Sequence, residues 1–131
     1  MKQAQVAFQV LAWLFVLGVA IQFLLAGLGV LGGEGIGAHR DWGYTALHLV
    51  PILMLIAAVI GRMGRLFIGL TVLLFALVFI QSIFADPDWD PQWVRSLHVL
   101  NALFIFMLGY HLAQRVGMPA LGKRMEPGRA E

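Results

Sequence analysis

Four long apolar runs, separated by short polar connectors, set the strongest limit on what this chain can fold into. The runs cover about residues 4–31, 38–60, 66–85 and 93–115. A helix needs about 20 apolar residues to cross a bilayer. Because lipid offers backbone groups no hydrogen-bond partner, such segments fold as helices. The sequence therefore predicts an all-α polytopic membrane protein, an antiparallel four-helix transmembrane bundle.

The distribution of charge supports this fold and predicts an orientation. Charged residues make up 12% of the chain, against about 25% in a soluble domain. The bundle is predicted over residues 1–115, followed by a basic tail over residues 116–131. Seven of the nine Lys and Arg residues fall on the side of the termini: Lys2, Arg62, Arg65, Arg115, Lys123, Arg124 and Arg129. Because positive residues favour the cytoplasmic side, both termini and the tail are predicted to be cytoplasmic.

Composition and motifs exclude several classes of function. The chain has no cysteine, which excludes disulfides, iron–sulfur clusters and c-type haem attachment. No phosphate loop, catalytic triad or metalloprotease motif occurs. The net charge of +2 lies in connectors and termini, so no nucleic-acid surface is expected. Between their ends the predicted spans carry no Asp, Glu, Lys or Arg, which argues against an ion pump or proton-coupled transporter.

A polar pair recurs in the two halves of the chain. Gln22 is followed by His39 at a spacing of 17 residues, and Gln81 is followed by His98 at the same spacing. The halves therefore match at an offset of 59 residues. Polar residues are costly inside a bilayer and need a partner. The repeat predicts two tandem helical hairpins related by pseudo-two-fold symmetry, each presenting one histidine to a shared centre.

Two opposed histidines in a membrane bundle are typical of b-type haem ligation. We therefore expect one haem b per chain, with His39 and His98 as metal ligands. In the same site Gln22 and Gln81 are expected to orient the imidazoles. At the membrane surface, Arg40 and Arg95 are expected to suit the haem propionates.

Other interpretations of the histidines stay open from the sequence alone. His48, nine residues after His39, points to the opposite helix face, and its depth favours it as the alternative ligand. His39 or His98 could instead be structural, hydrogen-bonded to a loop or to a polar neighbour. The remaining histidine, His111, is expected to be interfacial, and the alternative is half of a quinone-type polar site with Tyr110. The histidine spacings on the two ligand helices differ, which argues against a second haem.

The polar residues also carry a resemblance to a known family. The motifs are Gln22 to Gly29, His39-Arg40-x-x-Gly43-Tyr44, Gln81-Ser82 and Leu97-His98-x-x-Asn101-Ala102. They resemble an uncharacterised family of small four-helix bacterial integral membrane proteins, a domain of unknown function. This resemblance implies a bacterial cytoplasmic membrane and no established activity. The layout is similar, more loosely, to four-helix membrane b-type cytochromes.

The leading functional hypothesis is a cytochrome that transfers electrons across or along the membrane. Its expected partners are the lipid bilayer and either a quinone or a larger membrane protein complex. The alternative is a non-catalytic accessory subunit of a respiratory or photosynthetic complex, with structural or pigment-ligating histidines. A small transporter or lipid-binding protein is the third hypothesis. No residue is assigned a catalytic role.

Overall fold

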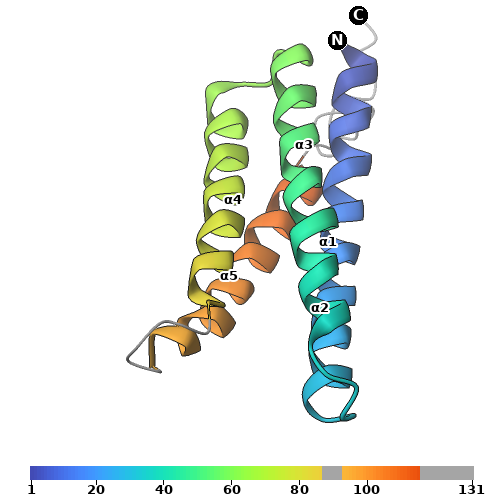
Figure 1. Cartoon of the computed structure of the whole chain (residues 1–131). Coiled ribbons are helices and arrows are strands. Elements are labelled where there is room, and N and C mark those ends of the chain that lie inside the picture. The colour runs from blue at the N-terminus through green and yellow to red at the C-terminus, as the bar shows by residue number, and fades with distance from the viewer. Residues whose placement is uncertain (87–92, 116–131) are drawn as a thin grey trace, which may run out of the picture.

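The computed structural model, which describes residues 1–86 and 93–115, contains four membrane-length helical segments (Figure 1). They are α1 (Lys2–Val30), the continuous run of α2 (Gly37–Trp42), η1 (Gly43–Leu47) and α3 (His48–Ile60), α4 (Arg65–Phe84), and α5 (Trp93–Arg115). All four are long and apolar enough to cross a membrane. The all-α prediction is confirmed, and the four helix boundaries agree to within about two residues. The predicted tail over residues 116–131 lies outside the described residues.

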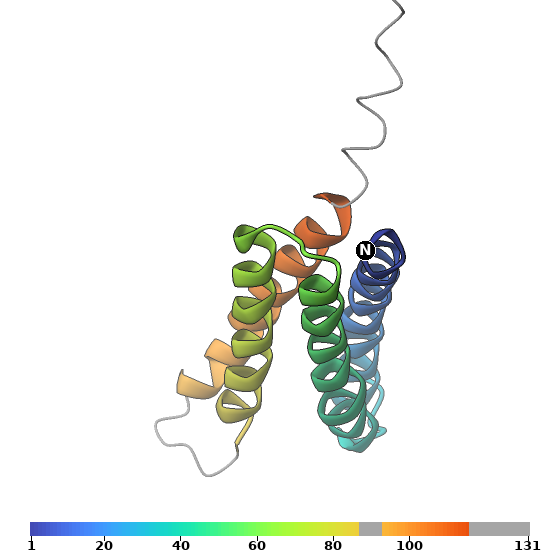
Figure 2. The ribbon, with the colours of Figure 1, turned by 90° about the horizontal axis from the view of Figure 1, so that it is seen from above.

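The helices form an antiparallel bundle. Helix α1 packs against α3 and α5, and α4 packs against the same two helices. Helix α3 therefore lies diagonally opposite α5, as expected for short connectors between up-and-down neighbours. Figures 1 and 2 show α3 next to α1, with α4 on the other side of α3. The N-terminus of α1 and the C-terminus of α5 lie at the same end of the bundle.

The bundle has a small core and an apolar exterior. Its largest fully buried side chains include Phe8, Phe15, Met54, Leu74 and Leu112. Many large apolar side chains are instead more than half exposed, among them Leu24, Ile60, Phe79 and Val99. A soluble domain rarely exposes so continuous an apolar surface. This exterior is what an integral membrane protein presents to lipid.

The second span is irregular before its proline rather than at it. Pro51 lies inside α3, and the span has a π-helical turn over Gly43–Leu47. Proline has no N–H to donate to the carbonyl four residues earlier, and its ring crowds that carbonyl. For Pro51 that carbonyl belongs to Leu47, the last residue of the π turn. The turn also re-aims the side chains on either side of it, which include His39 and His48.

A glycine-rich turn returns the chain from α1 to α2. Gly33 and Gly35 adopt φ values of 75° and 76°, a left-handed conformation that glycine tolerates without strain. A Cβ on Gly29 would lie 2.6 Å from the Gly35 carbonyl oxygen. The turn is therefore tight enough to place the start of α2 directly against the end of α1. This brings His39 beside Gln22.

Candidate functional site

The first Gln–His pair is joined by reciprocal hydrogen bonds between α1 and α2. The side-chain Nε2 of Gln22 donates to the backbone carbonyl of His39 at 2.9 Å. In return, Nδ1 of His39 donates to the backbone carbonyl of Gln22 at 3.1 Å. Because a carbonyl oxygen can only accept, Nδ1 carries the ring proton in this arrangement. The His39 ring is thereby oriented by main-chain geometry.

The second Gln–His pair repeats the same contacts between α4 and α5. Nε2 of Gln81 donates to the His98 carbonyl at 2.9 Å, and Nδ1 of His98 donates to the Gln81 carbonyl at 3.1 Å. The same atoms are therefore joined at the same distances in both halves. The repeat predicted at an offset of 59 residues is confirmed as a repeat of structure.

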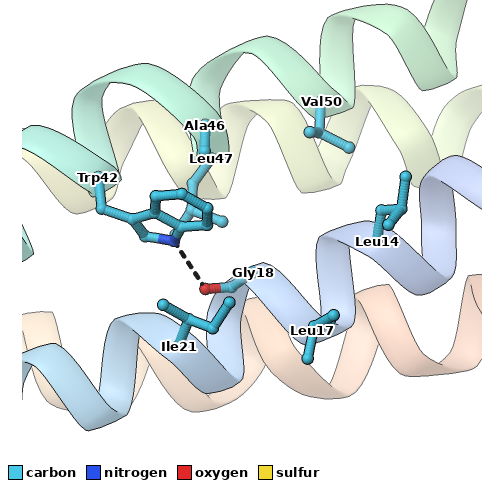
Figure 3. A pocket seen from close by; sticks show the side chains of 8 residues that line it. All are labelled: Leu14, Leu17, Gly18, Ile21, Trp42, Ala46, Leu47 and Val50. Carbon is cyan, nitrogen blue, oxygen red and sulfur yellow. Dashed lines mark hydrogen bonds between the residues drawn. The ribbon is translucent and has the colours of Figure 1, made fainter.

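A third hydrogen bond also occurs at equivalent positions in both halves, although the residues that form it differ. Nε1 of Trp42 donates to the Gly18 carbonyl at 2.9 Å (Figure 3). Nδ2 of Asn101 donates to the Leu77 carbonyl at 2.8 Å. Donors and acceptors both lie 59 residues apart, but a tryptophan corresponds to an asparagine and a glycine to a leucine. The residue types differ between the two halves, so the sequence comparison does not detect this contact. The positions of the donor and of the backbone acceptor are nevertheless the same in both halves.

The two repeated histidines meet at the centre of this end of the bundle. The ring centroids of His39 and His98 are 6.1 Å apart, with an interplanar angle of 60°. Two imidazoles that bind one metal ion from opposite sides have ring centres about 6 Å apart, because each metal–nitrogen bond is about 2 Å long and each nitrogen lies about 1 Å from the centre of its ring. Both Nδ1 atoms are occupied by carbonyls. The chemistry of the pair therefore rests on the two Nε2 atoms.

The surroundings of the two histidines differ. Oε1 of Gln81 accepts a hydrogen bond from the buried Asn101 at 2.7 Å, which locks this side-chain amide. Oε1 of Gln22 is buried and has no hydrogen-bond partner among the residues that the structure describes. The other amide atom of Gln22, Nε2, lies 3.3 Å from the ring nitrogen Nε2 of His39. His98 Nε2 has no hydrogen-bond partner within residues 1–86 and 93–115. The Gln81 side chain, which has a hydrogen bond at both amide atoms, is therefore fixed more firmly than the Gln22 side chain.

Gln22 and Gln81 were expected to orient the imidazoles, and the structure shows which of their atoms contact the rings. In the structure the glutamine backbone carbonyls orient the rings, and the side chains bind the histidine backbone. Gly43 makes room for the first of these amides, because a Cβ there would lie 2.8 Å from Nε2 of Gln22.

His48 occupies a separate site between the hairpins. Its Nδ1 donates to the Gly43 carbonyl at 2.8 Å, and its Nε2 accepts from the hydroxyl of Ser82 at 3.1 Å. The ring also stacks on Tyr44, with centroids 5.7 Å apart. Both ring nitrogens are therefore engaged, and the ring reaches toward α4. His39, the other candidate on this span, is the one that faces His98.

The remaining predicted residues lie at the periphery. Arg40 contacts Asp41 through Nε at 3.6 Å, and both side chains are mostly exposed. Arg95 is exposed on α5, one turn before His98. Both arginines therefore lie at the same end of the bundle as the histidine pair. His111 is exposed near the other end of α5, as expected for an interfacial residue.

The donor set around the histidines is small. In the described part of the chain, no three or more His, Cys, Asp or Glu side chains come together to hold a metal ion. Two cavities of about 190 and 180 Å³ in the described part of the bundle are lined by other residues. The arrangement offers two imidazole nitrogens and no third protein ligand.

The comparisons with known proteins agree with this description at the level of family. The family described as "Family of unknown function (DUF6220)" matches residues 22–87, which is half of the chain. The match begins at Gln22, includes His39 and Gln81, and ends before His98. No curated protein and no solved structure matches the chain. The expectation of an uncharacterised family is thereby confirmed.

Proposed function

The chain belongs to the family of unknown function DUF6220, and we propose that it is a membrane b-type cytochrome holding one haem between its second and fourth spans. The observation that carries the proposal is the His39–His98 pair, with ring centroids 6.1 Å apart. A b-type haem would be held here by the imidazoles of His39 and His98, one from each of the two spans. A site with two imidazoles and no third ligand suits such a haem better than it suits a bare metal ion, which takes at least four.

The hydrogen bonds of the site support Nε2 as the ligating nitrogen of both His39 and His98. A ligating histidine usually donates its other ring N–H to a carbonyl or carboxylate, which fixes the tautomer. His39 and His98 both do so through Nδ1. Nε2 of His98 has no hydrogen bond to another described residue, so it could bind iron directly. Nε2 of His39 would first have to lose its contact with the Gln22 amide. Haem would supply one-electron redox chemistry at this position.

The outer residues fit the rest of the cofactor. Arg40 and Arg95 would lie near the propionates at the membrane surface, where a guanidinium binds carboxylates in a bidentate manner. The His39–His98 site lies close to one face of the bilayer. We propose that it transfers electrons there between a quinone or partner complex and an acceptor. The orientation with cytoplasmic termini, in a bacterial membrane, completes this proposal.

A second function is favoured by one specific observation. The Gln22 amide already contacts Nε2 of His39, and the reciprocal bonds close each hairpin without a cofactor. Such bonds would serve an accessory subunit of a respiratory or photosynthetic complex equally well. In that role the histidines hold helices together, or one of them ligates a pigment.

Absorption spectroscopy separates the two functions. The protein is expressed with haem supplied, purified in detergent, and measured air-oxidised and then dithionite-reduced. A Soret band with sharp reduced α and β bands is expected, and His39→Ala or His98→Ala should each remove it. His111→Ala and His48→Ala should keep it, because neither residue belongs to the pair. A featureless wild-type spectrum would reject the cytochrome and favour the accessory subunit.

A further inference from the structure

A groove between α4 and α5 lies at the opposite end of the bundle from the histidine pair. Its volume is about 180 Å³, and its lining residues are Leu66, Phe67, Leu70, His111 and Arg115. Leu66, His111 and Arg115 are exposed. The groove therefore opens on the outside of the bundle, on the surface that faces lipid.

The charges around the groove are positive and lack acidic partners. Within the described ranges, the charged residues at this end are all basic: Lys2, Arg62, Arg65 and Arg115. The described carboxylates, Glu34, Asp41 and Asp86, lie at the other end. The one ion pair among the described residues also lies there, between Arg40 and Asp41. An anion in the groove would therefore meet no competing carboxylate from residues 1–86 and 93–115.

The two kinds of lining residue are arranged for an amphipathic ligand. Leu66, Phe67 and Leu70 form an apolar wall along α4. His111 and Arg115 lie one turn apart on one face of α5, so both line the groove, where Arg115 offers N–H donors and His111 a ring. Gly64 caps α4 without a side-chain hydrogen bond, and the positive end of the helix dipole adds to the attraction for an anion.

We propose that this groove binds one anionic phospholipid, with its phosphate beside Arg115 and His111 and an acyl chain along the α4 wall. Basic pockets between transmembrane helices favour anionic headgroups. A zwitterionic lipid carries the same phosphate together with a cation, which Arg115 repels. The preference for an anionic over a zwitterionic lipid therefore comes from the headgroup charge. The apolar wall contacts the acyl chain and does not distinguish the two lipids.

Native mass spectrometry of the detergent-solubilised protein tests the preference. Phosphatidylglycerol and phosphatidylcholine with the same acyl chains are titrated separately, and bound lipid is counted. Arg115→Gln should weaken phosphatidylglycerol binding about fivefold, equivalent to about 1 kcal/mol, and leave phosphatidylcholine binding unchanged. Arg62→Gln is the matched control, because it removes the same charge at the same end of the bundle from a residue that does not line the groove.

A second variant tests the apolar wall. Leu66→Trp fills the groove from an exposed position, so the core is undisturbed, and it should weaken the binding of both lipids. Equal effects of Arg115→Gln and Arg62→Gln, or no preference between the two lipids, would overturn the proposal. Displacement of phosphatidylglycerol by inorganic phosphate would reassign the groove to a free anion. These results do not depend on haem, since the His39–His98 pair lies at the opposite end.

Discussion

Replacing Asn101 with leucine should destabilise the bundle with little change in side-chain volume. The buried Asn101 amide donates to the Leu77 carbonyl at 2.8 Å and to Oε1 of Gln81 at 2.7 Å. Leucine removes both bonds and leaves Oε1 of Gln81 without this donor. An intramembrane side-chain hydrogen bond contributes about 0.6 kcal/mol on average and up to about 1.7. The free energy of unfolding should therefore fall by about 1–3 kcal/mol.

The assay is reversible unfolding in mixed micelles, with helix content followed by circular dichroism as the fraction of denaturing detergent rises. The expected loss raises the unfolding equilibrium constant between about fivefold and about a hundredfold. Gln114→Leu is the control, because Gln114 lies on the same helix and donates from an exposed position to Tyr110. It should change stability by less than about 0.5 kcal/mol. Equal stability of the Asn101 and Gln114 variants would refute the reasoning.

Two further variants probe the contacts between hairpins by the same assay. Gly109→Ala should cost about 1–3 kcal/mol by overpacking, because its Cβ would lie 2.8 Å from Cδ1 of Phe15; Gly69→Ala, with no such neighbour within 4 Å, should cost nothing. Ser82→Ala removes the donor to His48 and should lower the unfolding free energy by about 0.6–1.7 kcal/mol. A stable Gly109 variant, or a Ser82 variant that unfolds like the wild type, would contradict the assigned contact.

The histidine site was predictable because it depends on polar residues in an apolar chain. Gln22, His39, Gln81 and His98 stand out at one spacing, and the structure joins them in two matching pairs. The sequence could not rank His39 against His48, since depth favoured one and the repeat the other. The hydrogen bonds of His48 to Gly43 and Ser82 depend on the π turn and on how α3 meets α4. Neither is encoded in residue spacing.

The sequence by itself determined the number of spans, their boundaries and the two-fold repeat, because the bilayer penalises every uncompensated polar group. The tertiary structure decided which atoms meet. It assigned the orientation of the rings to glutamine carbonyls, and it matched Trp42 with Asn101 through equivalent backbone acceptors. It also left Oε1 of Gln22 unsatisfied while pairing that of Gln81. Those outcomes depend on distances of a few ångströms between packed helices, which apolar patterning along one chain does not specify.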